Sequence, residues 1–133
     1  MVSYYNPPEL PSSPAYSHAA VVERERLIFV SGQQALDAQG RLVGRDDFRR
    51  QAEQVFANVR QALAAAGADA SNVVAIYTHY VDRADLPAYR EARAAFFAGR
   101  SGAAPASTTV QVSGLVAEGA LLEVGVTAVL KSD

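Results

Sequence analysis

Glu123 is the residue whose chemical type fits its surroundings least. It stands within 121–130, an otherwise apolar, alternating stretch typical of a β-strand, where glutamate is disfavoured. Partial burial there would favour the protonated carboxyl and let it exchange a proton near neutral pH. The alternative is structural: Glu123 pairs with a base or lies on a solvated face. Its position in the sequence leaves both interpretations open.

The tripeptide Ser31-Gly32-Gln33 follows a short apolar strand. Glycine there would allow a ligand to approach the backbone closely, although the tripeptide can also be a plain strand end. Ser31 would need a neighbouring base to act as a nucleophile, and the sequence shows no such arrangement. His18 and His79 lack acidic partners at metal-binding spacing, so we expect packed or pocket histidines and no metal site.

Strands and helices must alternate to position these residues. Asp46 or Asp47 is expected to cap a helix that ends near Gly67, because apolar residues recur at three- and four-residue steps between them. A second helix is expected over 86–97, and Gly119 marks a turn. The remaining pattern predicts strands over 16–22, 27–30, 73–81, 106–112 and 121–130.

The predicted order is β-β-α-β-α-β-β, an α+β fold with two helices on one face of a mixed sheet. Residues 23–26 are expected to form a turn between the first two strands, giving a β-hairpin. The arm 1–14 carries four prolines and is expected to be irregular, and 37–40 is expected to be a loop or turn. We expect a single domain over 1–133.

The alternation within the last two strands predicts how their side chains divide. We expect the uncovered face of the sheet to carry Ser107, Thr109, Gln111 and Glu123. Since nothing else in the chain remains to cover this partly polar face, we predict that a second subunit does so in a homo-oligomer.

Composition excludes several functional classes. The chain has a net charge of −2 and shows no basic patch, so nucleic acid is not an expected partner. It contains no cysteine, which excludes disulfides and thiolate chemistry. No phosphate loop or dinucleotide fingerprint is present. Without a signal peptide or an apolar span, a cytoplasmic protein that does not bind membranes is expected.

Several segments together resemble the RidA/YjgF family, also called the Rid or L-PSP endoribonuclease family. Their order and spacing match from about residue 15 to 130. The matching segments are Tyr16-Ser17-His18-Ala19, 27–33, 54–59, 63–67, Tyr80-Val81-Asp82, Phe96-Phe97, Pro105-Ala106-Ser107 and 121–124.

The resemblance implies a chorismate-mutase-like (bacillus-type) fold assembled as a barrel-like homotrimer, with ligand clefts between neighbouring subunits. For the family's active branch it implies hydrolysis of reactive enamines or imines, such as 2-aminoacrylate, without a metal or organic cofactor.

The resemblance also implies site residues. Tyr16 matches the family's cleft tyrosine, while Ser31 and Gly32 match its corner of backbone donors. Thr109 takes the position whose backbone helps to hold ligand or water. Glu123 matches the glutamate that orients or activates water.

Ser107 departs from the pattern of the active branch. The family places there an arginine that clamps the substrate carboxylate, and serine cannot supply that charge. The chain therefore resembles an arginine-lacking subgroup acting on a metabolite other than 2-aminoacrylate. Arg90, on the second predicted helix, is one hypothetical replacement for the missing cation. An exposed helical arginine is the alternative for Arg90, as it is for Arg93.

The sequence leaves three competing functions. The first is a hydrolytic enamine or imine deaminase in which Glu123 handles water. The second is a trimer that binds or senses a small molecule without turnover, which the loss at Ser107 favours. The third, ribonuclease activity, is opposed by the acidic charge of the chain.

Overall fold

The computed structural model describes residues 1–131 and shows a mixed α+β fold. Within these residues the main sheet has four strands in the order β3-β6-β4-β5, and a separate sheet pairs β1 with β2. The β4–β5 pair is parallel, while β6 runs antiparallel to both β3 and β4. The strands are β1 (Val2–Tyr5), β2 (Ala19–Val22), β3 (Glu25–Gln33), β4 (Val73–Tyr80), β5 (Ala106–Gln111) and β6 (Leu122–Lys131).

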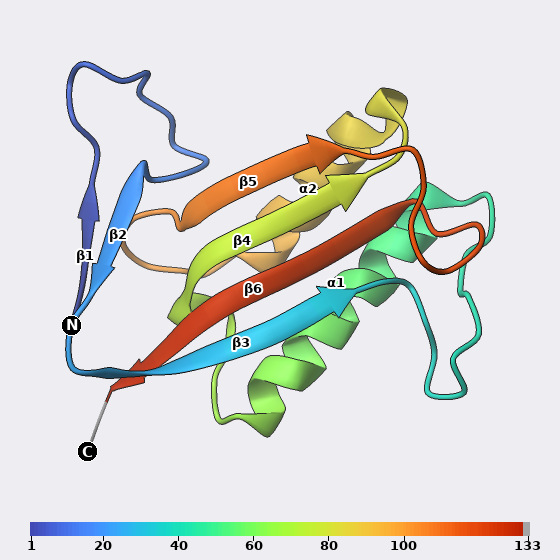
Figure 1. Cartoon of the computed structure of the whole chain (residues 1–133), viewed down its shortest axis with the longest axis horizontal. Helices are drawn as coiled ribbons and strands as arrows, with labels where there is room; N and C mark the ends of the chain where they lie inside the picture. Colours follow the sequence, from blue (N-terminus) through green and yellow to red (C-terminus); the bar gives the residue numbers. More distant parts are fainter. Residues whose placement is uncertain (132–133) are drawn as a thin grey trace.

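Two α-helices in the described chain, α1 (Phe48–Ala65) and α2 (Leu86–Phe96), lie on the same face of the main sheet (Figure 1). Short 3-10 helices, η1 (Ala70–Asn72) and η2 (Arg83–Asp85), precede β4 and α2. The predicted order of strands and helices is confirmed, and the first strand β1 is an addition to it.

The α1 helix begins and ends where its sequence predicts. The Asp47 side chain accepts a hydrogen bond from the Arg50 backbone N–H at 3.1 Å, which caps the first turn. Gly67 adopts a φ of +81° just beyond the helix, a conformation that glycine reaches without strain. The buried apolar face of α1 includes Val55, Val59 and Leu63.

The hydrophobic core lies between the helices and one face of the sheet. On β6, the core side chains are Leu122, Val124, Val126 and Ala128. Thr78 on β4 is also fully buried, and its hydroxyl lies 2.5 Å from the Tyr89 hydroxyl of α2. Burial raises the pKa of Tyr89, and the hydrogen bond with Thr78 partly opposes that rise.

The N-terminal region differs from its prediction in three ways. Val2–Tyr5 is a strand, so the arm 1–14 is not wholly irregular; its prolines begin only at Pro7, after that strand. The predicted hairpin is wrong, because β2 pairs with β1 whereas β3 pairs with β6. The predicted turn over 23–26 is shorter: Glu25 already belongs to β3.

The side-chain directions on β5 also differ from the prediction. Thr109 is in register with Thr78, whose side chain lies in the core on the helix-covered side. Glu123 is in register with His79, the next residue of β4, and therefore faces the opposite way. Alternation correctly predicted which residues of each strand share a face. It was wrong in placing Ser107, Thr109 and Gln111 on the uncovered face, because they lie on the helix-covered one.

Among residues 1–131, no helix has both the length and the apolar character needed to cross a membrane.

Candidate functional site

Glu123 is the centre of a polar cluster on the open face of the sheet, which we call the carboxylate corner (Ser31, Gly32, Gln34, His79 and Glu123). The Gln34 side-chain amide donates to Glu123 Oε1 at 3.0 Å. His79 Nδ1 lies 3.7 Å from Glu123 Oε2, an ion pair whenever the imidazole is protonated. The Glu123 side chain remains 25% exposed, so it is oriented by neighbours yet open to a ligand or water.

Gly32 is required for this arrangement because the carboxyl group lies directly against its Cα. A Cβ placed on Gly32 would stand 2.6 Å from Glu123 Cδ, closer than two carbon atoms can pack. The pairing of β3 with β6 shifts between Val30 and Gln33, which makes this segment a bulge or irregularity. Such bulges re-aim backbone and side chains and are frequent beside active sites.

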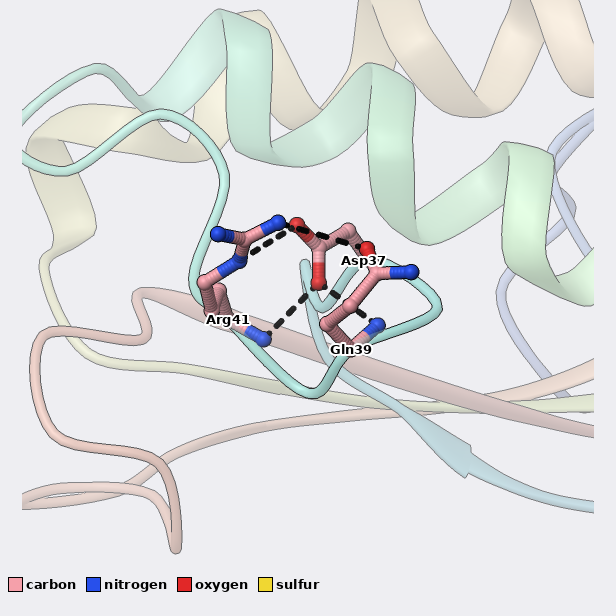
Figure 2. A network of polar contacts seen from close by, with 3 residues as sticks. All are labelled: Asp37, Gln39 and Arg41. Atoms are coloured by element: carbon pink, nitrogen blue, oxygen red, sulfur yellow. Dashed lines mark hydrogen bonds and ion pairs between the residues drawn. The ribbon is translucent and has the colours of Figure 1, made fainter.

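Asp37 and Ala38, at the start of a turn over 37–41, line a hollow of about 610 Å³ together with Gly32 and Gln34. Asp37 accepts hydrogen bonds from the backbone N–H groups of Gln39 and Arg41, each at 2.9 Å, and pairs with the Arg41 side chain (Figure 2). The Arg41 backbone N–H is the main reason that the pKa of Asp37 is lowered. The predicted turn is confirmed, and its hydrogen bonds fix the backbone at this side of the hollow.

A second cavity, the arginine pocket, lies beside α2 and β5 and has a volume of about 670 Å³. In the described chain its lining contains four arginines and no acidic residue. Apolar and aromatic side chains complete the walls. The lining includes Arg83, Leu86, Tyr89, Arg90, Arg93, Phe97, Arg100 and Thr109.

Arg93 connects this pocket to Ser107. Its Nη1 donates to Ser107 Oγ at 3.2 Å, and its Nη2 donates to the Ala15 carbonyl at 2.6 Å. The guanidinium carbon also lies 5.8 Å from the centre of the Phe97 ring. Arg93 is thus half-buried and held, not the solvated charge that its sequence context indicates, whereas Arg90 is exposed at the same pocket.

The segment carrying Tyr16 is attached near the arginine pocket. The Ser17 hydroxyl donates to the Ala104 carbonyl at 2.6 Å, and its backbone N–H donates to the Pro105 carbonyl at 3.1 Å. Tyr16 is half-buried and meets His18 edge-on, with ring centres 5.2 Å apart. His18 in turn contacts the Pro11 carbonyl at 2.7 Å, so this histidine holds the N-terminal arm.

The predicted site residues therefore fall into two groups within one chain. Ser31, Gly32 and Glu123 belong to the carboxylate corner, while Arg90, Ser107 and Thr109 lie around the arginine pocket on the helix-covered side. Strands β3 and β5 are the opposite edges of the sheet (Figure 1), three strand spacings or roughly 14 Å apart. A small ligand cannot contact both edges of the same chain.

Sequence reasoning missed Gln34 and the role of Arg93. Gln34 also accepts a hydrogen bond from the Ala117 backbone N–H at 2.9 Å, which fixes the amide that contacts Glu123. A signal for Arg93 was present, because arginines recur at 83, 90, 93 and 100 around a helix with few acidic residues. Among the described residues, no three His, Cys, Asp or Glu side chains are grouped to hold a metal ion.

Comparison with known proteins places this chain in one family. The family model described as Endoribonuclease L-PSP matches residues 8–130, and the chain belongs to this family. The Myxococcus xanthus protein DfrA is 38% identical over 100 residues, which are 75% of this chain and 74% of DfrA.

Two solved structures extend the comparison. A Yersinia pestis protein, YyfB, described as of unknown function in the conserved Rid protein family, superimposes with a TM-score of 0.86. It is 34% identical, covering 97% of this chain and 98% of its own. RidA from an Antarctic Psychrobacter is 30% identical with a TM-score of 0.67, covering 90% and 92% of the two chains. The resemblance expected from the sequence is confirmed, while the arginine-lacking subgroup remains a prediction.

Proposed function

We propose that this protein hydrolyses a small reactive imine or enamine, other than 2-aminoacrylate, to a carbonyl compound and ammonia. Water adds to the C=N carbon of the imine (R₂C=NH + H₂O → R₂C(OH)NH₂), and the resulting carbinolamine loses ammonia to leave R₂C=O. Glu123 takes a proton from the attacking water and returns it to the departing nitrogen. Backbone N–H groups near Ser31 and Gly32, together with those near Thr109 of a neighbouring copy, stabilise the developing charge.

The observation that carries this proposal is the placement of Glu123. Its carboxylate is oriented by Gln34, faces His79 and lies against the Cα of Gly32, yet a quarter of the side chain is exposed. A carboxylate on a merely solvated surface would not need a glycine at that distance. The arrangement fits a group that must meet a small molecule in one orientation.

Assembly as a homotrimer is part of the proposal. The open face exposes apolar side chains from three strands, Leu27 and Phe29 on β3, Tyr77 on β4 and Val110 on β5, and Phe29 is 76% exposed. Burying such a patch favours self-association. A neighbouring copy would also place its arginine pocket against the carboxylate corner, uniting groups that one chain keeps apart.

A ligand-binding trimer without turnover is the second candidate. Ser107, at the position where the family's active branch places its clamping arginine, favours it. Glu123→Gln separates the two candidates because glutamine keeps the size of the side chain and removes the base. Loss of turnover with ligand binding retained supports the enzyme.

The test is ammonia release from a panel of freshly generated imines, with and without carboxylate groups. The wild type is expected to accelerate release from at least one, and Glu123→Gln is expected to lower that rate about 100-fold or more. Glu53→Gln, on the exposed side of α1, is the matched control and should keep the wild-type rate. Equal rates for wild type and Glu123→Gln on every substrate would overturn the proposal.

A further inference from the structure

The arginine pocket concentrates positive charge in a chain whose net charge is −2. Four arginines line it, and no Asp or Glu among residues 1–131 does so. Within the described chain, the nearby Glu91 is paired with Arg49 on α1, away from the pocket. An unneutralised group of guanidinium ions at a cavity favours anionic ligands.

The four arginines differ in their contacts with the rest of the chain. Arg100 donates to the carbonyls of Ala103 and Val73, at 3.0 and 2.8 Å, and to the Tyr4 hydroxyl at 2.9 Å. Those contacts hold the chain around β4 together, so Arg100 has a structural role. Arg83 and Arg90 make no hydrogen bond or ion pair with other residues in 1–131, and both are exposed.

Arg93 is the arginine that the structure prepares for a ligand. A guanidinium has five N–H donors, and two of the Arg93 donors are used by Ser107 and Ala15. Ser107 therefore anchors a cation that reaches it from α2. The family's active branch has a positively charged arginine at the Ser107 position. Here Arg93, on α2, supplies a positive charge beside Ser107.

Arg90 can supply a second contact. It precedes Arg93 by three residues on α2, so their Cβ atoms are roughly 5–6 Å apart on neighbouring positions of the helix surface. Arginine binds carboxylates through paired N–H donors, and two such groups fit two carboxylates on a short carbon skeleton. Leu86 and Phe97 provide apolar contact for the skeleton itself.

We infer that the arginine pocket binds dicarboxylates, with Arg93 and Arg90 each holding one carboxylate group. The substrate assignment rests on the proposed deaminase function. With that function, the substrate is an imine or enamine bearing two carboxylates. Arg93 and Arg90 then determine specificity.

Calorimetric titration of the full-length protein with three probes of similar shape tests this inference. The probes are phthalate with two carboxylates, benzoate with one, and neutral benzamide, at constant ionic strength. Phthalate is expected to bind about tenfold or more tightly than benzoate, and benzoate more tightly than benzamide. Benzamide binding as tightly as phthalate would overturn the inference.

Substitutions assign the two carboxylate contacts. Arg90→Gln changes an exposed side chain and is expected to reduce phthalate affinity to about that of benzoate. Arg93→Gln is expected to weaken both anions, and Arg93→Lys, which keeps the charge but not the paired donors, should lie between. Arg26→Gln on the exposed part of β3 is the control. Unchanged probe affinities in both glutamine variants would refute the inference.

The binding and turnover experiments can refute the dicarboxylate pocket and the deaminase proposal separately. Arginine-dependent phthalate binding without any ammonia release would refute the deaminase proposal and leave the dicarboxylate pocket standing. Ammonia release whose KM for a dicarboxylate imine is unchanged by Arg90→Gln and Arg93→Gln would refute the pocket assignment alone.

Discussion

The two faces of the main sheet use alternate residues of the same strands for different purposes. On β6, Leu122, Val124 and Val126 are buried beneath the helices. Between them, Glu123 points to the open face, where Phe29 of the neighbouring β3 is 76% exposed. The covered face supplies the free energy of folding, whereas the open face presents a carboxylate and an apolar surface that a folded monomer does not need.

Removing a side chain from the covered face should have the largest effect on stability. Leu63→Ala leaves a cavity at a fully buried position on α1 and should lower the free energy of unfolding by about 2–5 kcal/mol. Urea denaturation measures the change. Val116→Ala, at a loop residue that is almost fully exposed, is the control and should cost less than about 0.5 kcal/mol. A similar loss of unfolding free energy in both variants would contradict the prediction that the covered face contributes more to stability than exposed positions do.

A charge on the open face should affect assembly instead. Phe29→Glu would place like charges together wherever copies meet, weakening association by about 2 kcal/mol or more while each chain stays folded. Analytical ultracentrifugation measures the assembly and circular dichroism the fold. Val116→Glu is the matched control. If Phe29→Glu retains the wild-type assembly, the open face is not the surface through which copies associate.

The carboxylate corner should lose activity without losing much stability. Gly32→Ala would displace the Glu123 carboxyl and lower ammonia release by about 10- to 100-fold. Gly114→Ala is a good control, because a Cβ there meets nothing within 4 Å in the described structure. Steady-state kinetics with thermal melts separate the two effects. Full activity in Gly32→Ala would show that the contact between Gly32 and Glu123 is unimportant.

The smallest expected effect is a pH dependence on the covered face. Burial raises the pKa of Tyr89 in the folded state, so its stabilising contribution is complete below the unfolded value of about 10 and is lost as pH rises through the folded value. Tyr89→Phe should cost about 1 kcal/mol at pH 8 through loss of the hydrogen bond with Thr78. Urea melts should show that cost shrinking above pH 10. A constant difference would contradict the prediction.

Features that depend only on residues close together in the sequence could be predicted from it. The cap at Asp47 and the apolar spacing up to Leu63 are properties of one helix, and both are confirmed. The face of Ser107 could not be predicted in the same way, because alternation relates neighbours on a strand but does not say which face the helices cover. Only the pairing of Thr109 with Thr78 determines it.

Arg93 shows the same limit at the site. Its spacing on α2 is that of an ordinary surface residue, while its partners Ser107 and Ala15 are 14 and 78 residues away in sequence. The β1 strand was missed for another reason, since the prolines that follow Tyr5 obscured four residues with good strand propensity.

The register between β4 and β5 has a consequence for how this sequence can change in length. Because side chains alternate, a one-residue slip of β5 would turn Ser107 away from Arg93 and bring Thr108 to its place. Ser17 holds the connection over 97–105 in place, because it donates hydrogen bonds to the carbonyls of Ala104 and Pro105. A substitution there keeps the register, but an insertion or deletion that moves it would alter the ligand preference of the pocket without replacing any residue in it.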